Sequence, residues 1–167
     1  MSIIRRINIG EGMLYRAVRL AALGESPDAF SSKLADAILR TEESWHTQAD
    51  QGARGSDRAI FLAIDEDPTG LAALYRDERF DHTTELIQMW VCPECRSCGL
   101  SQELLSSAAG WARTNGYRTI RAEVMPNNHR ALRFYERCGF RRDEEAAPNP
   151  EAGIILRYDV EPAAARP

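Results

Sequence analysis

One segment of the sequence, Val91–Ser101, combines the residue types that bind a phosphate group. It joins an apolar stretch directly to the start of a helical one, so several backbone N–H groups there lack helical partners. The helix dipole adds partial positive charge, which favours a phosphate or pyrophosphate. Gly99 would let the backbone approach the anion, while Arg96 and Ser101 could donate to it. A lone glycine is a weak signal, and an ordinary strand–helix turn explains it equally well.

Three cysteines, Cys92, Cys95 and Cys98, lie in the same segment with two residues between neighbours. Such spacing can serve zinc or an iron–sulfur cluster, but the site needs a fourth ligand and a loop free to wrap the metal. These residues are already committed to a strand end and a helix start. We therefore expect no metal and reduced thiols, with Cys138 packed in the core from a later helix.

The elements that flank this segment follow from hydrophobic periodicity. Residues 85–91 are typical of a buried central strand, and Leu100–Asn115 has apolar residues on one helical face. The other predicted strands are residues 3–9, 59–64, 71–75, 119–124, 140–145 and 154–160. The other predicted helices are residues 11–23, 32–48 and 128–138, and residues 49–57 are predicted as a loop.

This order of elements predicts a mixed α/β (α+β) fold. The turn sequence at residues 65–70 indicates an antiparallel hairpin, whereas strand–helix–strand from Glu85 to Val124 indicates a parallel pair with a right-handed crossover. We expect a mostly antiparallel sheet of about seven strands with a parallel central pair, flanked by four helices. Residues 1–160 are expected to form one domain and residues 161–167 a flexible tail.

The composition argues against several classes of function. A chain of 167 residues with 44% hydrophobic and 28% charged residues is typical of one globular domain. Its formal net charge of −4 argues against a nucleic-acid partner, which needs clustered positive charge. No apolar run approaches the roughly 20 residues that cross a bilayer, and the N-terminus lacks the apolar segment of a signal peptide. We expect a cytoplasmic protein without a membrane partner.

Two segments carry a resemblance to a known family. Residues 96–101, Arg-Ser-Cys-Gly-Leu-Ser, are similar to a pyrophosphate loop written (Q/R)-x-x-G-x-(G/A). Residues 128–140 are similar to the pattern N-x-x-A-x-x-(apolar)-Y-x-x-x-G-F. Both patterns, in this order and at this separation, resemble the GNAT superfamily of acetyl-CoA-dependent N-acetyltransferases, whose element order also matches the predicted one. Ser101 departs from the usual Gly or Ala, and Cys98 from a common Arg or Gly.

The resemblance implies acetyl-CoA (coenzyme A) as acyl donor, no metal, and direct transfer to a primary amine in a ternary complex. A backbone N–H within Met89–Val91 would stabilise the oxyanion. Asn128 would fix the pantetheine arm or the turn before its helix, although a helix N-cap needs no ligand. The implied coenzyme-binding residues are Met89, Trp90, Val91, Arg96, Ser97, Cys98, Gly99, Leu100, Ser101, Asn128 and Tyr135.

Two residues are candidates for proton transfer. Tyr135 matches the tyrosine that protonates the departing thiolate in the family, although its position alone favours a core aromatic residue. Glu123 matches the base of family members that acetylate protein N-termini. It alternates with Ile120 and Ala122 along a strand, so a surface carboxylate is the alternative interpretation. Glu85 remains a rival base.

The implied acceptor is a small-molecule amine or a peptide N-terminus. The negative net charge of the chain mildly favours a cationic amine. Phe30, Trp45, His46 and Tyr75 are candidates for lining its pocket. Homodimers are common in the family. The alternatives are a non-catalytic acyl-CoA-binding or sensor domain on the same fold, and a cysteine-rich metal protein.

Overall fold

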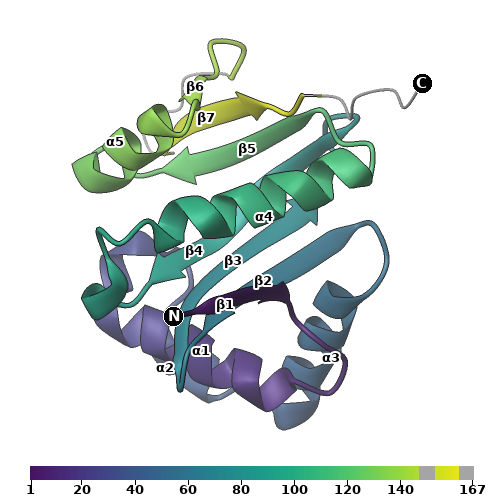
Figure 1. Ribbon diagram of the computed structural model, residues 1–167, viewed down its shortest axis with the longest axis vertical. Helices are drawn as coiled ribbons and strands as arrows, with labels where there is room; N and C mark the ends of the chain where they lie inside the picture. The colour runs from purple at the N-terminus through teal and green to yellow at the C-terminus, as the bar shows by residue number, and fades with distance from the viewer. Residues whose placement is uncertain (147–152, 162–167) are drawn as a thin grey trace.

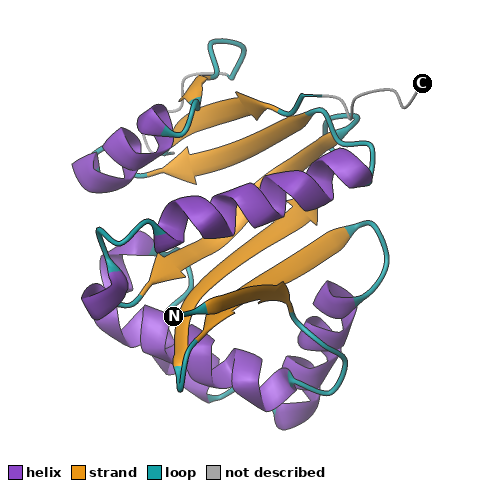
Figure 2. Cartoon of the chain, in the orientation of Figure 1, coloured by secondary structure: helices purple, strands orange, loops and turns teal. Residues whose placement is uncertain are grey.

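A seven-stranded mixed sheet forms the centre of the molecule (Figures 1 and 2). The computed structural model describes residues 1–146 and 153–161. The strands are β1 (Ile3–Arg6), β2 (Arg58–Ile64), β3 (Pro68–Arg76), β4 (Thr83–Val91), β5 (Thr119–Val124), β6 (Arg141–Arg142) and β7 (Ile154–Asp159). They lie in the order β1-β2-β3-β4-β5-β7-β6, and neighbours are antiparallel except β4 and β5. This confirms the predicted mixed sheet with a parallel central pair.

Helices cover both faces of the sheet, and each face has its own core. The α-helices are α1 (Gly12–Glu25), α2 (Leu34–Ile38), α3 (Glu42–Ala53), α4 (Leu100–Thr114) and α5 (His129–Arg137), with short 3-10 turns at Pro27–Ala29 and Pro93–Cys95. α4 crosses one face (Figure 1), where its Leu104 packs in the core that contains Leu74 of β3. On the other face, Tyr15 of α1 packs edge-on against Trp45 of α3. The alternation of side chains along each strand supplies both cores.

β4 and β5 separate after a short parallel ladder. The ladder has three register pairs, the last of which joins Glu85 to Arg121. Within the described strands, residues 86–91 of β4 and 122–124 of β5 do not pair with each other. The facing edges of these segments therefore carry backbone groups that a bound molecule can satisfy.

A β-bulge bends β4 where it leaves β5. Two residues of β4, Gln88 and Met89, lie opposite the single residue Ala72 of β3. Gln88 has a φ of 58°, which is uncommon for a residue other than glycine. Tyr15 of α1 holds it there by donating a hydrogen bond to Gln88 Oε1 at 2.7 Å. Because a bulge bends its strand and increases the local twist, it accounts for the divergence of β4 from β5.

The second predicted helix, residues 32–48, is divided into α2 and α3, so five α-helices replace the predicted four. The division occurs at Thr41, whose backbone is extended and whose hydroxyl accepts a hydrogen bond from the Ser44 N–H at 3.2 Å. This N-cap begins a new helix. α3 then continues to Ala53, through residues that were predicted as a loop.

The closing hairpin is shorter than predicted, since β6 contains only Arg141–Arg142. The predicted turn around Pro148 and Pro150 lies outside the described residues, as does the predicted tail except for Glu161. None of the helices in the described ranges has the length and apolar character needed to cross a bilayer.

The N-cap of α3 gives a stability prediction. Thr41→Ala should lower the free energy of unfolding by about 1 kcal/mol, because the N–H of Ser44 loses its acceptor. Thr47 is exposed on α3, so Thr47→Ala is a matched control that should be neutral or slightly stabilising. Chemical denaturation of both variants tests the assignment, and equal stabilities would contradict it.

Candidate functional site

The turn between β4 and α4 presents a cluster of free backbone donors. Ser97 and Gly99 have φ values of 67° and 88°, and α4 begins at Leu100. The N–H groups of residues 97–102 donate to no carbonyl among the described residues. Successive N–H groups in such a turn form an anion-binding concavity, and the N-terminus of α4 adds its positive dipole end. A turn of this kind can bind a phosphate or pyrophosphate.

Gly99 is required by its backbone conformation rather than by lack of space. A Cβ at this position would meet no atom within 4 Å. The open side of Gly99 is thus available to a ligand. Cys98 is exposed beside it and donates its thiol to the Cys95 carbonyl at 2.6 Å, which ties down the turn.

The guanidinium of Arg96 is held in place by hydrogen bonds to two protein groups. Its Nε donates to the Val91 carbonyl at 3.0 Å, and its Nη2 donates to Glu25 Oε2 at 2.5 Å. The same carboxylate oxygen accepts from Trp90 Nε1 at 2.9 Å. Arg96 above all lowers the pKa of Glu25 to about 2, so the carboxylate is charged at neutral pH. Sequence reasoning missed Glu25, because nothing in its type or spacing links the end of α1 to a turn so far along the chain.

The other cysteines are less accessible. Cys92 and Cys95 are partly buried, and burial raises the pKa of Cys92 to about 11. Among the residues that the structure describes, no group of three His, Cys, Asp or Glu side chains is arranged to hold a metal ion.

Tyr135 lies in the core that α4 and α5 share. Its ring centroid is 5.1 Å from that of Phe140 and 5.2 Å from that of Phe134. Burial, and to a lesser degree Cys138, raises the pKa of Tyr135, so its hydroxyl is protonated at neutral pH. At the start of α5, Asn128 accepts a hydrogen bond from the Ala131 N–H at 3.1 Å. Asn128 is therefore a helix N-cap, whatever its part in binding.

Two carboxylates lie on the sheet face opposite α4. Glu123 is exposed, two residues beyond the last β4–β5 pair, and its Oε1 accepts from the Gly153 N–H at 2.8 Å. Glu85 belongs to that last pair and is half-buried, and it forms an ion pair with Arg79. Burial, followed by the charge of Asp77, raises the pKa of Glu85. Glu123 and Glu85, the two candidates for the general base, therefore lie on the same face of the sheet, but Glu123 is exposed and Glu85 is half-buried.

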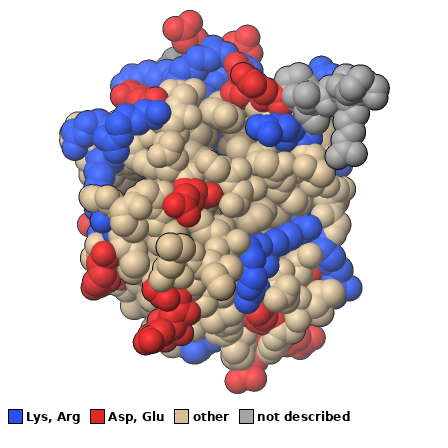
Figure 3. All heavy atoms as spheres, in the orientation of Figure 1, with Lys and Arg blue, Asp and Glu red and all other residues tan. Residues whose placement is uncertain are grey.

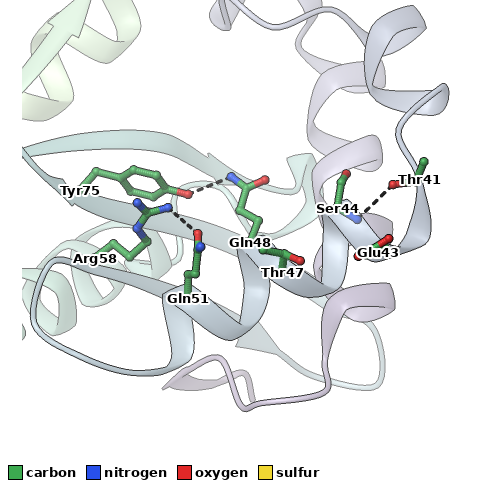
Figure 4. Close-up of a pocket in the computed structure, with 8 residues that line it drawn as sticks. All are labelled: Thr41, Glu43, Ser44, Thr47, Gln48, Gln51, Arg58 and Tyr75. Carbon is green, nitrogen blue, oxygen red and sulfur yellow. Dashed lines mark hydrogen bonds between the residues drawn. The ribbon is translucent and has the colours of Figure 1, made fainter.

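A polar pocket of about 470 Å³ lies on the same face, between α3 and the sheet (Figure 4). Gln48 Nε2 donates to the Tyr75 hydroxyl at 2.8 Å, and the Arg58 guanidinium lies 4.7 Å from the centre of the Tyr75 ring. The lining residues are Thr41, Glu43, Ser44, Thr47, Gln48, Gln51, Arg58 and Tyr75.

The four residues predicted to line the acceptor pocket have different positions. Tyr75 lines the pocket just described, whereas Trp45 is fully buried in the core. His46 packs directly against Gly12, where even a Cβ would clash with it. Phe30 is partly buried, 4.7 Å from the guanidinium of Arg19.

The sequence match agrees with this geometry. The model of the acetyltransferase (GNAT) family matches residues 25–140, which is more than half of the chain and contains β4, the turn, α4 and α5. The chain belongs to the GNAT acetyltransferase family. No curated protein sequence matches it.

Solved GNAT structures share the fold across their full length. A GNAT acetyltransferase from Streptococcus pneumoniae has a TM-score of 0.78 at 20% identity, covering 96% of this chain and 100% of its own. The PaiA N-acetyltransferase from Thermoplasma acidophilum in complex with coenzyme A has a TM-score of 0.75 at 17% identity, covering 95% and 99%. A spermidine N-acetyltransferase from Vibrio cholerae, in complex with CoA and spermine, has 0.70 at 16% identity, covering 95% of each chain. At these identities the likeness establishes the fold.

The exposed surface of helix α5, near the turn between β4 and α4, is cationic. Arg130, Arg133 and Arg137 are exposed on α5, and α5 lies at the same end of the sheet as the start of α4 (Figure 1). Figure 3 shows basic side chains gathered over this part of the molecule. Such a surface favours a ligand with several negative charges, although the chain as a whole is acidic.

The turn gives a binding prediction. Gly99→Val should weaken acetyl-CoA binding by at least about tenfold, because valine disfavours the φ of 88° and would move the N–H groups away from a common anion. Calorimetric titration with acetyl-CoA measures the loss.

Gly55 provides the matched control. It also has a positive φ, 74°, and open space around its Cβ position, but it lies in the loop after α3. Gly55→Val should impose similar strain and leave acetyl-CoA affinity unchanged. If Gly99→Val binds as tightly as the wild type, the turn is not the pyrophosphate site.

Proposed function

We propose that this GNAT protein transfers an acetyl group from acetyl-CoA to a primary amine, by direct attack in a ternary complex. The observation that carries the proposal is the turn of free N–H groups at residues 97–102, placed where β4 and β5 have separated. The pyrophosphate would bind the turn, and the pantetheine arm would extend between the diverging strands. The acyl group would then lie beside the β4 bulge at Met89.

The β4 bulge supports the oxyanion role of Met89–Val91. This part of β4 has no β5 partner, so a backbone N–H on its open edge can stabilise the negative oxygen of a tetrahedral intermediate. Glu25 and Arg96 support the same region, since they bind Trp90 and the Val91 carbonyl. In this proposal both residues position the strand end and the turn.

Tyr135 would protonate the departing thiolate. Its raised pKa keeps the hydroxyl protonated but also makes it a weaker acid than an ordinary thiol, whose pKa is near 8.5, so the transfer to a thiolate is unfavourable and the tyrosinate must regain a proton from solvent. The proton would therefore pass late, as the carbon–sulfur bond breaks and the thiolate forms.

Glu123 would accept the proton of the attacking amine. It lies beyond the last β4–β5 pair, where the strands part, and it is open to solvent. Glu85 is the weaker candidate, because its carboxylate already forms an ion pair with Arg79. Its raised pKa would nevertheless suit a base, so the two residues are tested together.

An acceptor panel tests the proposed activity. Release of CoA from acetyl-CoA should depend on an added amine, in a screen of polyamines, amino acids, aminoglycosides and N-terminal peptides. If acetyl-CoA binds and no amine supports CoA release, the protein is the non-catalytic acyl-CoA-binding or sensor domain that shares this fold.

Removal of the Tyr135 hydroxyl should act on turnover. Tyr135→Phe is expected to lower kcat by about 10²–10⁴-fold with little change in acetyl-CoA affinity, because it removes a proton donor and keeps the ring. Tyr117 is the control, since its hydroxyl donates to the Ser56 carbonyl at 2.6 Å. Tyr117→Phe should lower stability by about 1 kcal/mol and preserve kcat. A wild-type kcat for Tyr135→Phe would assign Tyr135 to the core alone.

The two carboxylates are separated by their pH profiles. Glu123→Gln should lower kcat/KM by about 10²–10⁴-fold and remove the acidic limb of the profile, because no carboxylate remains to be protonated. Glu85→Gln should leave that limb in place. The reverse result, with activity lost as pH falls through the raised pKa of Glu85, would assign the base to Glu85.

A further inference from the structure

Arg19 on α1 is a buried cation without a partner. Its side chain lies in the interior with the residue only 5% exposed, and Nη1 is sealed from solvent with no hydrogen-bond acceptor. No ion pair within the described part of the chain includes it. A buried charge in this state is unfavourable unless an anion or a hydrogen-bond acceptor pairs with it.

The surroundings of Arg19 are cationic and aromatic. Its guanidinium stacks on Phe30 at 4.7 Å, and the charged or titratable groups that act on it are Tyr15, Arg40 and Tyr75. Arg40 adds a second positive charge, with its guanidinium 3.7 Å from the Trp45 ring centre. None of the carboxylates in the described ranges, 1–146 and 153–161, forms an ion pair with Arg19 or acts on its pKa, which burial lowers. Within the described part of the chain, Arg19 is thus a cation that no side chain neutralises, and an external anion could pair with it.

Arg19 lies on the acceptor side of the proposed transfer site. Tyr15, one helical turn before it, donates to Gln88 in the β4 bulge, next to Met89. Tyr75, which acts on Arg19, pairs in register with Glu85, so Arg19 lies over the sheet face that carries the carboxylates of β4 and β5. A molecule with an anionic end and an amino end matches this arrangement of charge.

We propose that Arg19 binds the carboxylate of the acceptor, which makes the acceptor a small amine that also carries a carboxylate, such as an amino acid. This rests on the proposed acetyl transfer at the β4 bulge. A planar guanidinium fork matches a carboxylate through two parallel hydrogen bonds. With the carboxylate at Arg19, the amino group would face the bulge and the carboxylates beyond it.

Matched acceptors test the class. Each of the common α-amino acids is compared with its amide and with the amine left by its decarboxylation, using CoA release by the wild-type protein. At least one amino acid should exceed both derivatives in kcat/KM by about tenfold or more. Equal or better rates with the carboxylate-free amines would overturn the proposal, as would a preference for amino-sugar phosphates or polyamines.

Variants at Arg19 connect the preference to this residue. Arg19→Met should raise KM for the preferred amino acid by about 10- to 100-fold and change the rate with its decarboxylated amine by less than about threefold. Arg19→Lys should recover part of the loss, because the charge returns without the fork. An equal loss with both acceptors would overturn the assignment.

Stability distinguishes a ligand-binding arginine from a structural one. Arg19→Met should keep or raise the melting temperature, since it removes a buried charge that has no partner. Arg6 is the matched control, because its guanidinium donates to the carbonyls of Gly52, Gly55 and Arg58. Arg6→Met should lower the melting temperature and leave the acceptor preference unchanged. A fall in melting temperature for Arg19→Met of the same size as for Arg6→Met would show that Arg19 is structural.

Binding measured without turnover separates this inference from the transfer reaction. Calorimetry of the CoA-loaded wild type should detect the amino acid, and the Arg19→Met protein should bind it at least about tenfold more weakly. Such binding without any acetyl transfer would reject the proposed function alone. Acetyl transfer to carboxylate-free amines, with no Arg19-dependent binding, would reject this inference alone.

Discussion

The early end of the β4–β5 ladder is the constraint on which the rest of the structure depends. Parallel strands normally continue side by side, yet this pair stops after Glu85 and Arg121. The opening leaves backbone groups of β4 and β5 unpaired with each other in the middle of the sheet, where a bound molecule can reach them. The β4 bulge produces the opening from within the strand, and Tyr15 stabilises the bulge from α1. In the proposed reaction, Gln88 would thereby link the acceptor side to the coenzyme side.

Ion pairs hold the two ends of this opening in different ways. At the closed end, Arg121 is 3.1 Å from Asp143 and 4.0 Å from the buried Asp77, and it stacks on Phe80 at 4.3 Å. These contacts join β5 to the loop between β3 and β4 and to Asp143, the residue that follows β6. At the open end, the carboxylate of Glu25 joins α1 to the turn residue Arg96. Because the closed-end ion pairs are more buried than the Arg96–Glu25 pair, we expect any adjustment to a ligand to occur at the open end.

The sequence predicted those features that depend on neighbouring residues. The turn at Gly99, helix α4 and the parallel pair follow from local periodicity and from the glycine before the helix, whereas the left-handed backbone of Ser97 was not predicted. The split at Thr41 was missed, although a threonine N-cap is a local signal, because the apolar period continues through it. The Gln88 bulge and the Glu25 brace depend on contacts between residues far apart in the chain, so no local pattern indicates them.

The charge of the whole chain and the charge of its interior point to different acceptors. A net charge of −4 attracts a cationic amine over a distance, but water and salt screen that attraction. Arg19 is 5% exposed, so its interaction with a bound anion is screened far less and weighs more in the choice of ligand. A zwitterion would suit both charges, because its ammonium group is attracted to the acidic surface and its carboxylate would pair with the buried Arg19.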